Sequence, residues 1–281
     1  MDEVARPRGP SYAETMVRFI NVPFNSAGIA GGVANMPAAL GFEGVEIAVR
    51  ATPVRGPFGF LAEDALVTMV ADVAVAVTDA ERDGETPIVI GGDCPVMLGA
   101  LAALRPVGLV FIDGHEDAWQ PTAELSGEAA DSELGIALGL VPAPIPPVLD
   151  AGRVVVLGPR DSAEIEQLGQ RRIDGVVALR GAEWVEAASL DEVREVVGPA
   201  TASNWWLHVD LDVLSSDALS AVDYPQPGGL GWARLDAVTD TVLAISGCRG
   251  ASIAIYNPDL DAGATAPCVR EYVSRVAALL D

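Results

Sequence analysis

The chain has 281 residues, a length compatible with one large α/β domain, and its hydrophobic fraction of 50% allows a sizeable buried core. Lys and Arg together number 17 against 40 Asp and Glu, and the resulting net charge of −23 excludes nucleic acid and anionic membranes as partners. The sequence contains no lysine, which excludes a P-loop and Schiff-base chemistry.

Short β-branched runs alternate along the chain with longer amphipathic or alanine-rich segments. This alternation predicts a mostly parallel sheet covered by helices on both faces, in a single three-layer α/β (αβα) domain over 1–281. Residues 1–17 are expected to form a flexible N-terminal segment. In chain order, we expect a strand over 17–22, a helix over 62–83, a strand over 88–91, a helix over 95–104, a strand over 108–112, a helix over 132–140, a strand over 153–157, a helix over 163–170, a strand over 175–178, a helix over 190–197, a strand over 205–211, a helix over 232–246, a strand over 250–255 and a helix over 267–280.

The cysteines and the N-terminal residues bear on the compartment. Cys94, Cys248 and Cys268 are odd in number, widely spaced and form no CxxC pair. The first residues lack the apolar run of a signal peptide, and no apolar stretch reaches the roughly 18 residues that span a membrane. We therefore expect reduced thiols and a cytoplasmic protein.

Three clusters of metal-ligating side chains follow expected strands: GGDC (91–94), DGHED (113–117) and HVDLD (208–212). Ligands bind beyond the carboxyl ends of strands in open α/β sheets, so we expect the clusters to meet. Residues that alternate in extended backbone point to one side, and we expect the aspartates and His115 to do so. Oxygen-rich ligation of this kind favours Mn, and a pair of such ions supplies a hydroxide nucleophile at neutral pH. The candidate ligands are Cys94, Asp113, His115, Asp117, Asp210 and Asp212.

The order and wording of these clusters resemble the ureohydrolase superfamily of arginases, agmatinases and formiminoglutamases. That family carries GGDH, then D-A-H-x-D, then S-x-D-x-D and a loop that ends in GGL. Here the segments read GGDC, DGHED and HVDLDVLSSDALSAVDYPQPGGL, and the resemblance runs from about Phe19 to the end of the chain. It implies an arginase-like sheet, two divalent ions, a small nitrogen-rich substrate and a homo-oligomer.

The resemblance also implies how the ligands divide between the two ions. Asp113 and Asp210 would bridge both ions; the remaining ligands would be Cys94 and Asp117 at one ion, and His115 and Asp212 at the other. Cys94 has a second interpretation, because free cysteine is often a small buried hydrophobe. As a ligand, its softer sulfur would admit Fe, Co or Zn beside Mn.

Two departures from the family pattern concern catalysis and substrate. Guanidine-cleaving members place a carboxylate in an E-V-N-P segment, where this chain has Ile255, which cannot pair with a planar cation. The family's loop histidine is also missing, which leaves Glu128, Asp131 or Glu133 as candidates for proton transfer, or as residues of a helix N-terminus. Asp117 is the candidate for orienting the hydroxide.

Three further residues lie close to these motifs. His208 begins the HVDLD segment and is expected to pack in the core or to support the ligands from behind. Trp119 is expected to wall the pocket, and Arg160 either orients substrate or caps a helix.

The sequence leads to two hypotheses of function. The first is a metal-dependent hydrolase that cleaves a linear C–N bond and is not an ordinary arginase or agmatinase. Its substrate would be a guanidine, hydroxyguanidine, amidine, ureide or amide, or an arginine within a peptide. The second is a ureohydrolase-like protein that has lost catalysis and serves as a binding or scaffold subunit. Retention of five carboxylate and imidazole ligands favours the first, because clustered carboxylates repel one another without cations.

Overall fold

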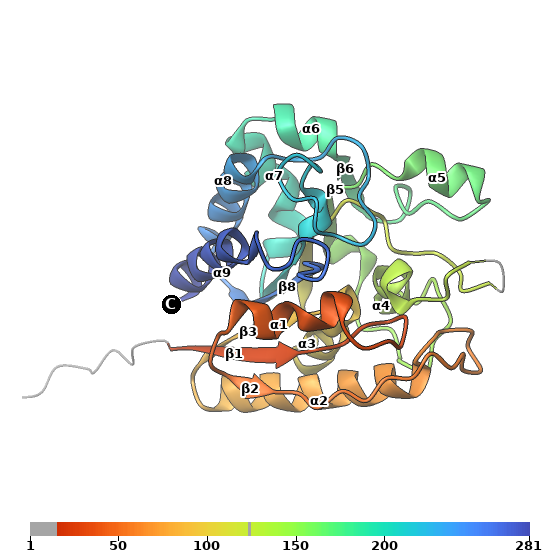
Figure 1. The fold of residues 1–281 in the computed structure, drawn as a ribbon. Coiled ribbons are helices and arrows are strands. Elements are labelled where there is room, and N and C mark those ends of the chain that lie inside the picture. Colours follow the sequence, from red (N-terminus) through yellow and green to blue (C-terminus); the bar gives the residue numbers. More distant parts are fainter. Residues whose placement is uncertain (1–15, 123–124) are drawn as a thin grey trace, which may run out of the picture.

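The structure is a computed structural model that describes residues 16–122 and 125–281. Its centre is an eight-stranded sheet in the order β2-β1-β3-β8-β7-β4-β5-β6, and every pair of neighbouring strands is parallel (Figure 1). The expected α/β fold with its mostly parallel sheet is confirmed. The strands are β1 (Val17–Val22), β2 (Val45–Glu46), β3 (Thr86–Gly91), β4 (Gly108–Ile112), β5 (Val154–Gly158), β6 (Ala178–Gly181), β7 (Trp205–Asp210) and β8 (Cys248–Ala254).

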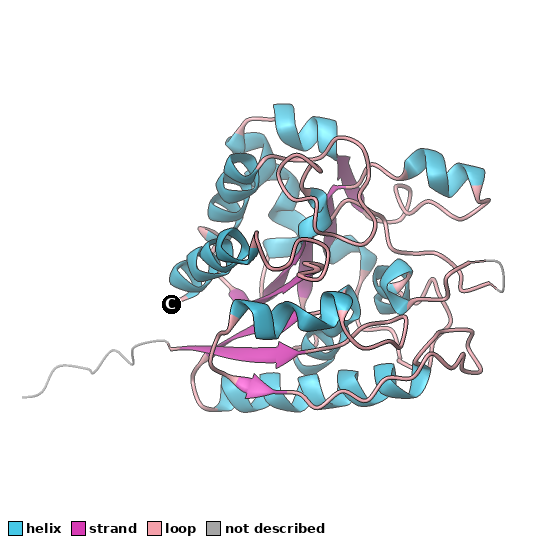
Figure 2. Ribbon diagram, in the orientation of Figure 1, coloured by secondary structure: helices cyan, strands magenta, loops and turns pink. Residues whose placement is uncertain are grey.

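Helices cover both faces of the sheet (Figure 2). One apolar core lies between the sheet and α2, α3 and α4, and a second lies between the sheet and α1, α6, α7, α8 and α9. The interior strands β7, β4 and β5 are buried along their whole length because both faces are covered. The helices are α1 (Met36–Leu40), α2 (Glu63–Arg82), α3 (Met97–Ala103), α4 (Glu133–Ala137), α5 (Ser162–Gln167), α6 (Ala182–Ala187), α7 (Leu190–Thr201), α8 (Trp232–Leu243) and α9 (Ala266–Leu280).

Most expected elements are present with shifted ends, and β1 and β4 have the expected bounds. The expected strand over 175–178 was wrong in position, because Val176 and Val177 donate backbone hydrogen bonds to the Ile173 carbonyl in a turn. The strand β6 begins only at Ala178, where pairing with β5 starts. The sequence pattern did not indicate β2, α1 or α6, which are short.

The prediction of a flexible segment over 1–17 can be compared with the structure only at residues 16 and 17. Residues 1–15 of the expected flexible segment lie outside the described residues, and Val17 already belongs to β1. One domain over the whole of 1–281 stays a prediction. No helix in the described ranges is long and apolar enough to cross a membrane.

The sheet order positions the site. The chain passes from β3 to β4 without pairing them, and β8 and β7 later fill the space between them. The carboxyl ends of β3, β8, β7 and β4 are therefore neighbours at one edge, although the segments that follow them are far apart in sequence. Such a switch in strand order is where α/β sheets bind ligands.

Candidate metal centre and its pocket

The loop after β4 carries Asp113, His115 and Asp117. The backbone N–H of His115 donates to Asp113 Oδ1 over 2.7 Å, a turn stabilised by the aspartate side chain. Asp117 has a positive φ of 41°. The expectation of extended, alternating backbone was therefore wrong here, since the turn and the left-handed residue bring the three side chains together instead.

The segment after β7 repeats this turn. The backbone N–H of Asp212 donates to Asp210 Oδ1 over 2.6 Å, and Asp212 lies in a 3-10 turn, Leu211–Val213, rather than in the strand. Asp212 then connects to the neighbouring loop, because its Oδ1 accepts from the Gly114 N–H at 3.0 Å and its Oδ2 lies 2.9 Å from His115 Nδ1. The two aspartate-rich clusters are thus in direct contact.

Cys94 joins them from the 3-10 turn that follows β3, Cys94–Val96. Its Sγ donates to Asp210 Oδ2 over 2.8 Å, and the residue is 1% exposed. Burial, with nearby Asp210, raises the pKa of the Cys94 thiol well above its usual value. All six candidate ligands therefore lie at one place, at the carboxyl edge of the sheet.

The electrostatics of the cluster show that it suits cations. Burial and then neighbouring carboxylates raise the pKa values of Asp113, Asp117 and Asp210. Burial would also raise the pKa of Asp212, but His115 beside it lowers that pKa below its usual value. Within the described chain, the buried Oδ2 of Asp113 has no hydrogen-bond partner. Divalent cations fit such a cluster, because they would offset the repulsion between the carboxylates and give the unpartnered oxygen of Asp113 a partner.

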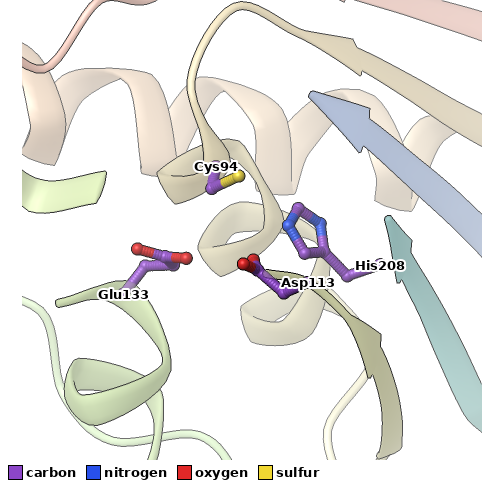
Figure 3. A group of neighbouring side chains, drawn as sticks. All are labelled: Cys94, Asp113, Glu133 and His208. Carbon is purple, nitrogen blue, oxygen red and sulfur yellow. The ribbon is translucent and has the colours of Figure 1, made fainter. Parts of the chain in front are cut away.

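Within the described ranges, three sets of side chains come close enough to hold an ion, and all share Asp113. They are Asp113, His115 and Asp117; Asp113, Asp210 and Asp212; and Cys94, Asp113, Glu133 and His208, with the ligand atoms of each set within 4.8 Å of one another. Figure 3 shows the third set converging from four elements. Sequence reasoning missed Glu133 and His208 as candidate ligands. The signal for His208 was present, because it alternates with Asp210 along β7 and so lies on the same face.

A cavity of about 450 Å³ opens above the cluster. Trp119 lies in its wall, as expected. No arginine contributes to the wall in the part of the chain that the structure describes, and His115 is its one basic side chain there. The carboxylates that line it are Asp93, Asp117, Glu128, Asp131, Glu164, Asp210, Asp212 and Asp223.

The three candidates for proton transfer occupy different places. Glu128 is half-buried in the cavity wall, where burial and then nearby Asp93 raise its pKa to about 7, and Tyr224 Oη donates to it over 3.3 Å. Asp131 also lines the cavity and accepts from the Ser126 hydroxyl. Glu133 is fully buried beside Cys94 and is absent from the described cavity lining.

Ile255 follows β8 and lines the cavity, at the place where the family pattern has a carboxylate. Its φ is 69°, a left-handed conformation that is rare for a β-branched residue. Its N–H donates to the Gly92 carbonyl over 2.9 Å, which ties the end of β8 to the GGDC segment. An apolar side chain is thus held in the pocket by a strained backbone.

Of the two roles considered for it, Arg160 takes the capping one, because it donates to carbonyls at the end of the 3-10 turn Leu211–Val213 and does not line the described cavity. Its guanidinium donates to the backbone carbonyls of Asp212 at 2.7 Å, Leu214 at 3.2 Å and Gln226 at 3.3 Å. Arg160 therefore holds the segment after β7 in place beneath the cavity.

The comparisons with known proteins agree with this architecture. The model of the Arginase family matches residues 39–278, and the chain belongs to that family. The chain is 25% identical over 217 residues to an arginase of Brevibacillus brevis, and this match covers 70% of this chain and 70% of that protein. It is 26% identical over 178 residues to an N(1)-aminopropylagmatine ureohydrolase of Synechocystis sp., covering 61% of this chain and 52% of that protein. The crystal structure of arginase from Bacillus cereus has the same fold, with a TM-score of 0.79 and 19% identity. The match covers 94% of this chain and 98% of that one.

Proposed function

We propose that the protein is a binuclear-metal-dependent hydrolase that cleaves a linear C–N bond in a small, positively charged, nitrogen-rich metabolite. The observation that carries the proposal is the meeting of three potential ligand sets on Asp113, at the carboxyl edge of an arginase-family sheet. Mn is the ion that the oxygen-rich ligands favour, and Cys94 admits Fe, Co or Zn.

In this proposal Asp113 and Asp210 would be shared by the two ions. His115 and Asp212, which already contact each other, would hold one ion, and Cys94 and Asp117 would face the other. Bound divalent ions lower the pKa of a coordinated water, so that a hydroxide nucleophile is available at neutral pH. The chain contributes a preformed ligand cage, because turns and backbone hydrogen bonds fix the aspartates before any ion binds.

The remaining catalytic steps belong to residues of the cavity wall. Asp117 lines the cavity and would orient the nucleophile by accepting its hydrogen. Glu128, with a pKa of about 7, is matched to exchange a proton with the leaving nitrogen at neutral pH. Trp119 and Tyr224 would limit the access of water once the substrate is bound.

The proposal for the substrate rests on charge. Carboxylates that are not assigned to the ions, among them Glu128, Asp131 and Asp223, give the cavity a negative field, and such a field attracts cations and disfavours anions. The compound in the name of the Synechocystis relative, N(1)-aminopropylagmatine, carries amino groups that are cationic at neutral pH, in keeping with such a substrate. Ile255 leaves no carboxylate at the expected guanidinium position, so hydroxyguanidines and other modified guanidines are better candidates than arginine or agmatine.

A metal-supplemented screen tests this function. Purified protein loaded with Mn²⁺, Zn²⁺, Co²⁺ or Fe²⁺ is incubated with guanidino, amidino, ureido and amide compounds, and released urea and ammonia are measured. We expect metal-dependent turnover of a cationic compound. Stoichiometric metal without any turnover would favour the inactive binding protein instead, and absence of metal after supplementation would refute the site. Self-association stays a prediction, which light scattering on the eluted protein tests.

A further inference from the structure

We propose that the ion beside Cys94 is held in this chain by His208 and Glu133 together with Asp113, so that its imidazole ligand comes from β7. The inference rests on the proposed metal centre and concerns how one of its two positions is built. It replaces the interpretations of His208 as a packing residue and of Glu133 as a proton shuttle.

The first argument is that the two side chains present buried, unpartnered atoms at the same point. His208 and Glu133 are both 0% exposed. Among the described residues, His208 Nε2 and both carboxylate oxygens of Glu133 find no hydrogen-bond partner. Buried polar groups are rarely left unpaired, because an unpaired group loses its hydrogen bonds to water without replacement. A cation at the shared point would satisfy all three atoms together.

The second argument is that the His208 ring is held in a fixed orientation. Its ring stacks on Phe111 of the adjacent strand β4, with centroids 5.0 Å apart. On the other side, Nδ1 lies 2.7 Å from the Oγ of Ser252 in β8, which also accepts from Trp206 Nε1 at 2.9 Å. Metal-binding histidines commonly donate their second ring N–H to such a partner. With Nδ1 donating to Ser252, the lone pair of Nε2 faces Cys94 and Asp113 (Figure 3).

The third argument is that Glu133 is positioned by the ligand loop itself. Glu133 is the first residue of α4, and the N–H of Gly135 in this helix donates to the Asp117 carbonyl over 2.9 Å. The N–H of Trp119 donates to the Asp131 carbonyl over 2.9 Å. These bonds dock the start of α4 against the 113–117 loop and so hold the carboxylate of Glu133 beside the candidate ligands.

The chemistry of this set differs from that of the other position. Imidazole nitrogen, cysteine sulfur and two carboxylates form a mixed set, which favours Zn, Fe or Co. At the other position, His115 and Asp212 together with the shared Asp113 and Asp210 form a set richer in oxygen, which suits Mn. The two positions are therefore expected to prefer different metals.

The deciding experiment uses the unmodified chain, which has only two histidines, His115 and His208. Protein labelled with ¹⁵N in the imidazole rings is titrated with Cd²⁺ or Zn²⁺ and followed by NMR. We expect a ring nitrogen of each histidine to show the shift of a metal-bound nitrogen, with coupling to ¹¹³Cd, and His115→Asn assigns the signals. A protein that binds metal through His115 while His208 is unchanged overturns the inference alone. A protein in which neither ring responds and no metal is retained overturns the proposed function as well.

Two variants provide an independent readout by metal analysis. Glu133→Gln keeps the shape of the side chain, and should weaken binding of one ion by more than the roughly 10- to 100-fold typical of residues that only support a ligand. Its control is Glu63→Gln, because Glu63 is likewise a buried first residue of a helix but accepts from the Phe58 N–H, away from the cluster. Unchanged metal content in Glu133→Gln contradicts the role of Glu133.

His208→Ser is compared with the double variant Cys94→His/His208→Ser. The double variant supplies an imidazole to the same proposed ion position from residue 94, and it nearly conserves the summed volume of the two side chains. We expect the single variant to lose about one ion per chain and the double variant to regain it. A folded His208→Ser protein that retains both ions contradicts the role of His208.

Discussion

Asp113 lies in every potential ligand set of the cluster, so both ions should depend on it. We expect Asp113→Asn to abolish stoichiometric binding at both positions, whereas His115→Ala should weaken chiefly one of them. Elemental analysis after dialysis at a buffered free-metal concentration measures both effects. Asp240→Asn, which changes a partly exposed carboxylate paired with Arg275, should leave the metal content unaltered. Retention of one ion by Asp113→Asn would show that this carboxylate is not shared.

Glu128 should carry the proton transfer near neutral pH. Glu128→Gln is expected to lower kcat by about a hundred- to ten-thousandfold and to remove the pH dependence near 7. A pH–rate profile tests this, with Glu164→Gln as a variant that removes an equal charge from the same cavity wall. If the pH dependence near 7 persists in Glu128→Gln, Asp131 becomes the candidate for proton transfer instead.

The same pKa shift has a consequence for stability. Burial raises the pKa of Glu128 from 4.5 to about 7, so the folded state binds its proton more tightly than the unfolded state. Between these pH values the metal-free protein should lose stability as the pH rises, and below about 4.5 this loss is absent. Denaturant unfolding across this range should show a smaller pH dependence for Glu128→Gln.

Ile255 tests the substrate proposal directly. Ile255→Glu should raise agmatine turnover, because a buried charged hydrogen bond contributes about 1.5–3 kcal/mol, or roughly ten- to more than a hundredfold in binding. The unbranched side chain also suits the left-handed backbone better than isoleucine does. Ile255→Gln is the control for side-chain shape. Because it lacks the negative charge, it should give little of the rise in agmatine turnover expected for Ile255→Glu. Efficient agmatine or arginine hydrolysis by the unmodified protein would refute the argument.

At the scale of elements, the segment after β7 depends on Arg160, which donates to four of its backbone carbonyls. Arg160→Met should loosen this segment and reduce metal affinity by about 10- to 100-fold. Isothermal titration with Mn²⁺ measures the change. Arg153→Met is the matched control, because Arg153 donates to the Asn204 carbonyl at 2.8 Å, just before β7 at the opposite end of that strand. Equal losses in both variants would indicate general destabilisation.

The elements themselves were largely predictable from periodicity, and the failures have physical reasons. The β-branched pair Val176 and Val177 favours a strand, yet the strand starts one residue later, where pairing with β5 becomes available. The short elements β2 and α1 contain too few residues for a pattern to emerge. Their formation depends on neighbours, as in the pairing of Ile20 with Val45.

At the scale of the molecule, the net charge of −23 and the carboxylate-lined cavity should attract cationic substrates from a distance. For such a substrate, kcat/KM should fall steadily as NaCl is raised past about 0.1 M, where the screening length is about 10 Å. A neutral substrate analogue should show almost no such change. A cationic substrate whose kcat/KM is insensitive to salt would contradict electrostatic steering.

The sequence by itself determined the alternation of strands and helices, the charge and the types of candidate ligand, because these are local properties of residue type and spacing. Only the tertiary structure decided which side chains meet. Glu133 and His208 reach Cys94 and Asp113 from separate elements, and Asp117 turns inward through a left-handed residue. No local pattern encodes such convergence, since it depends on the strand order and on the docking of α4 against the ligand loop.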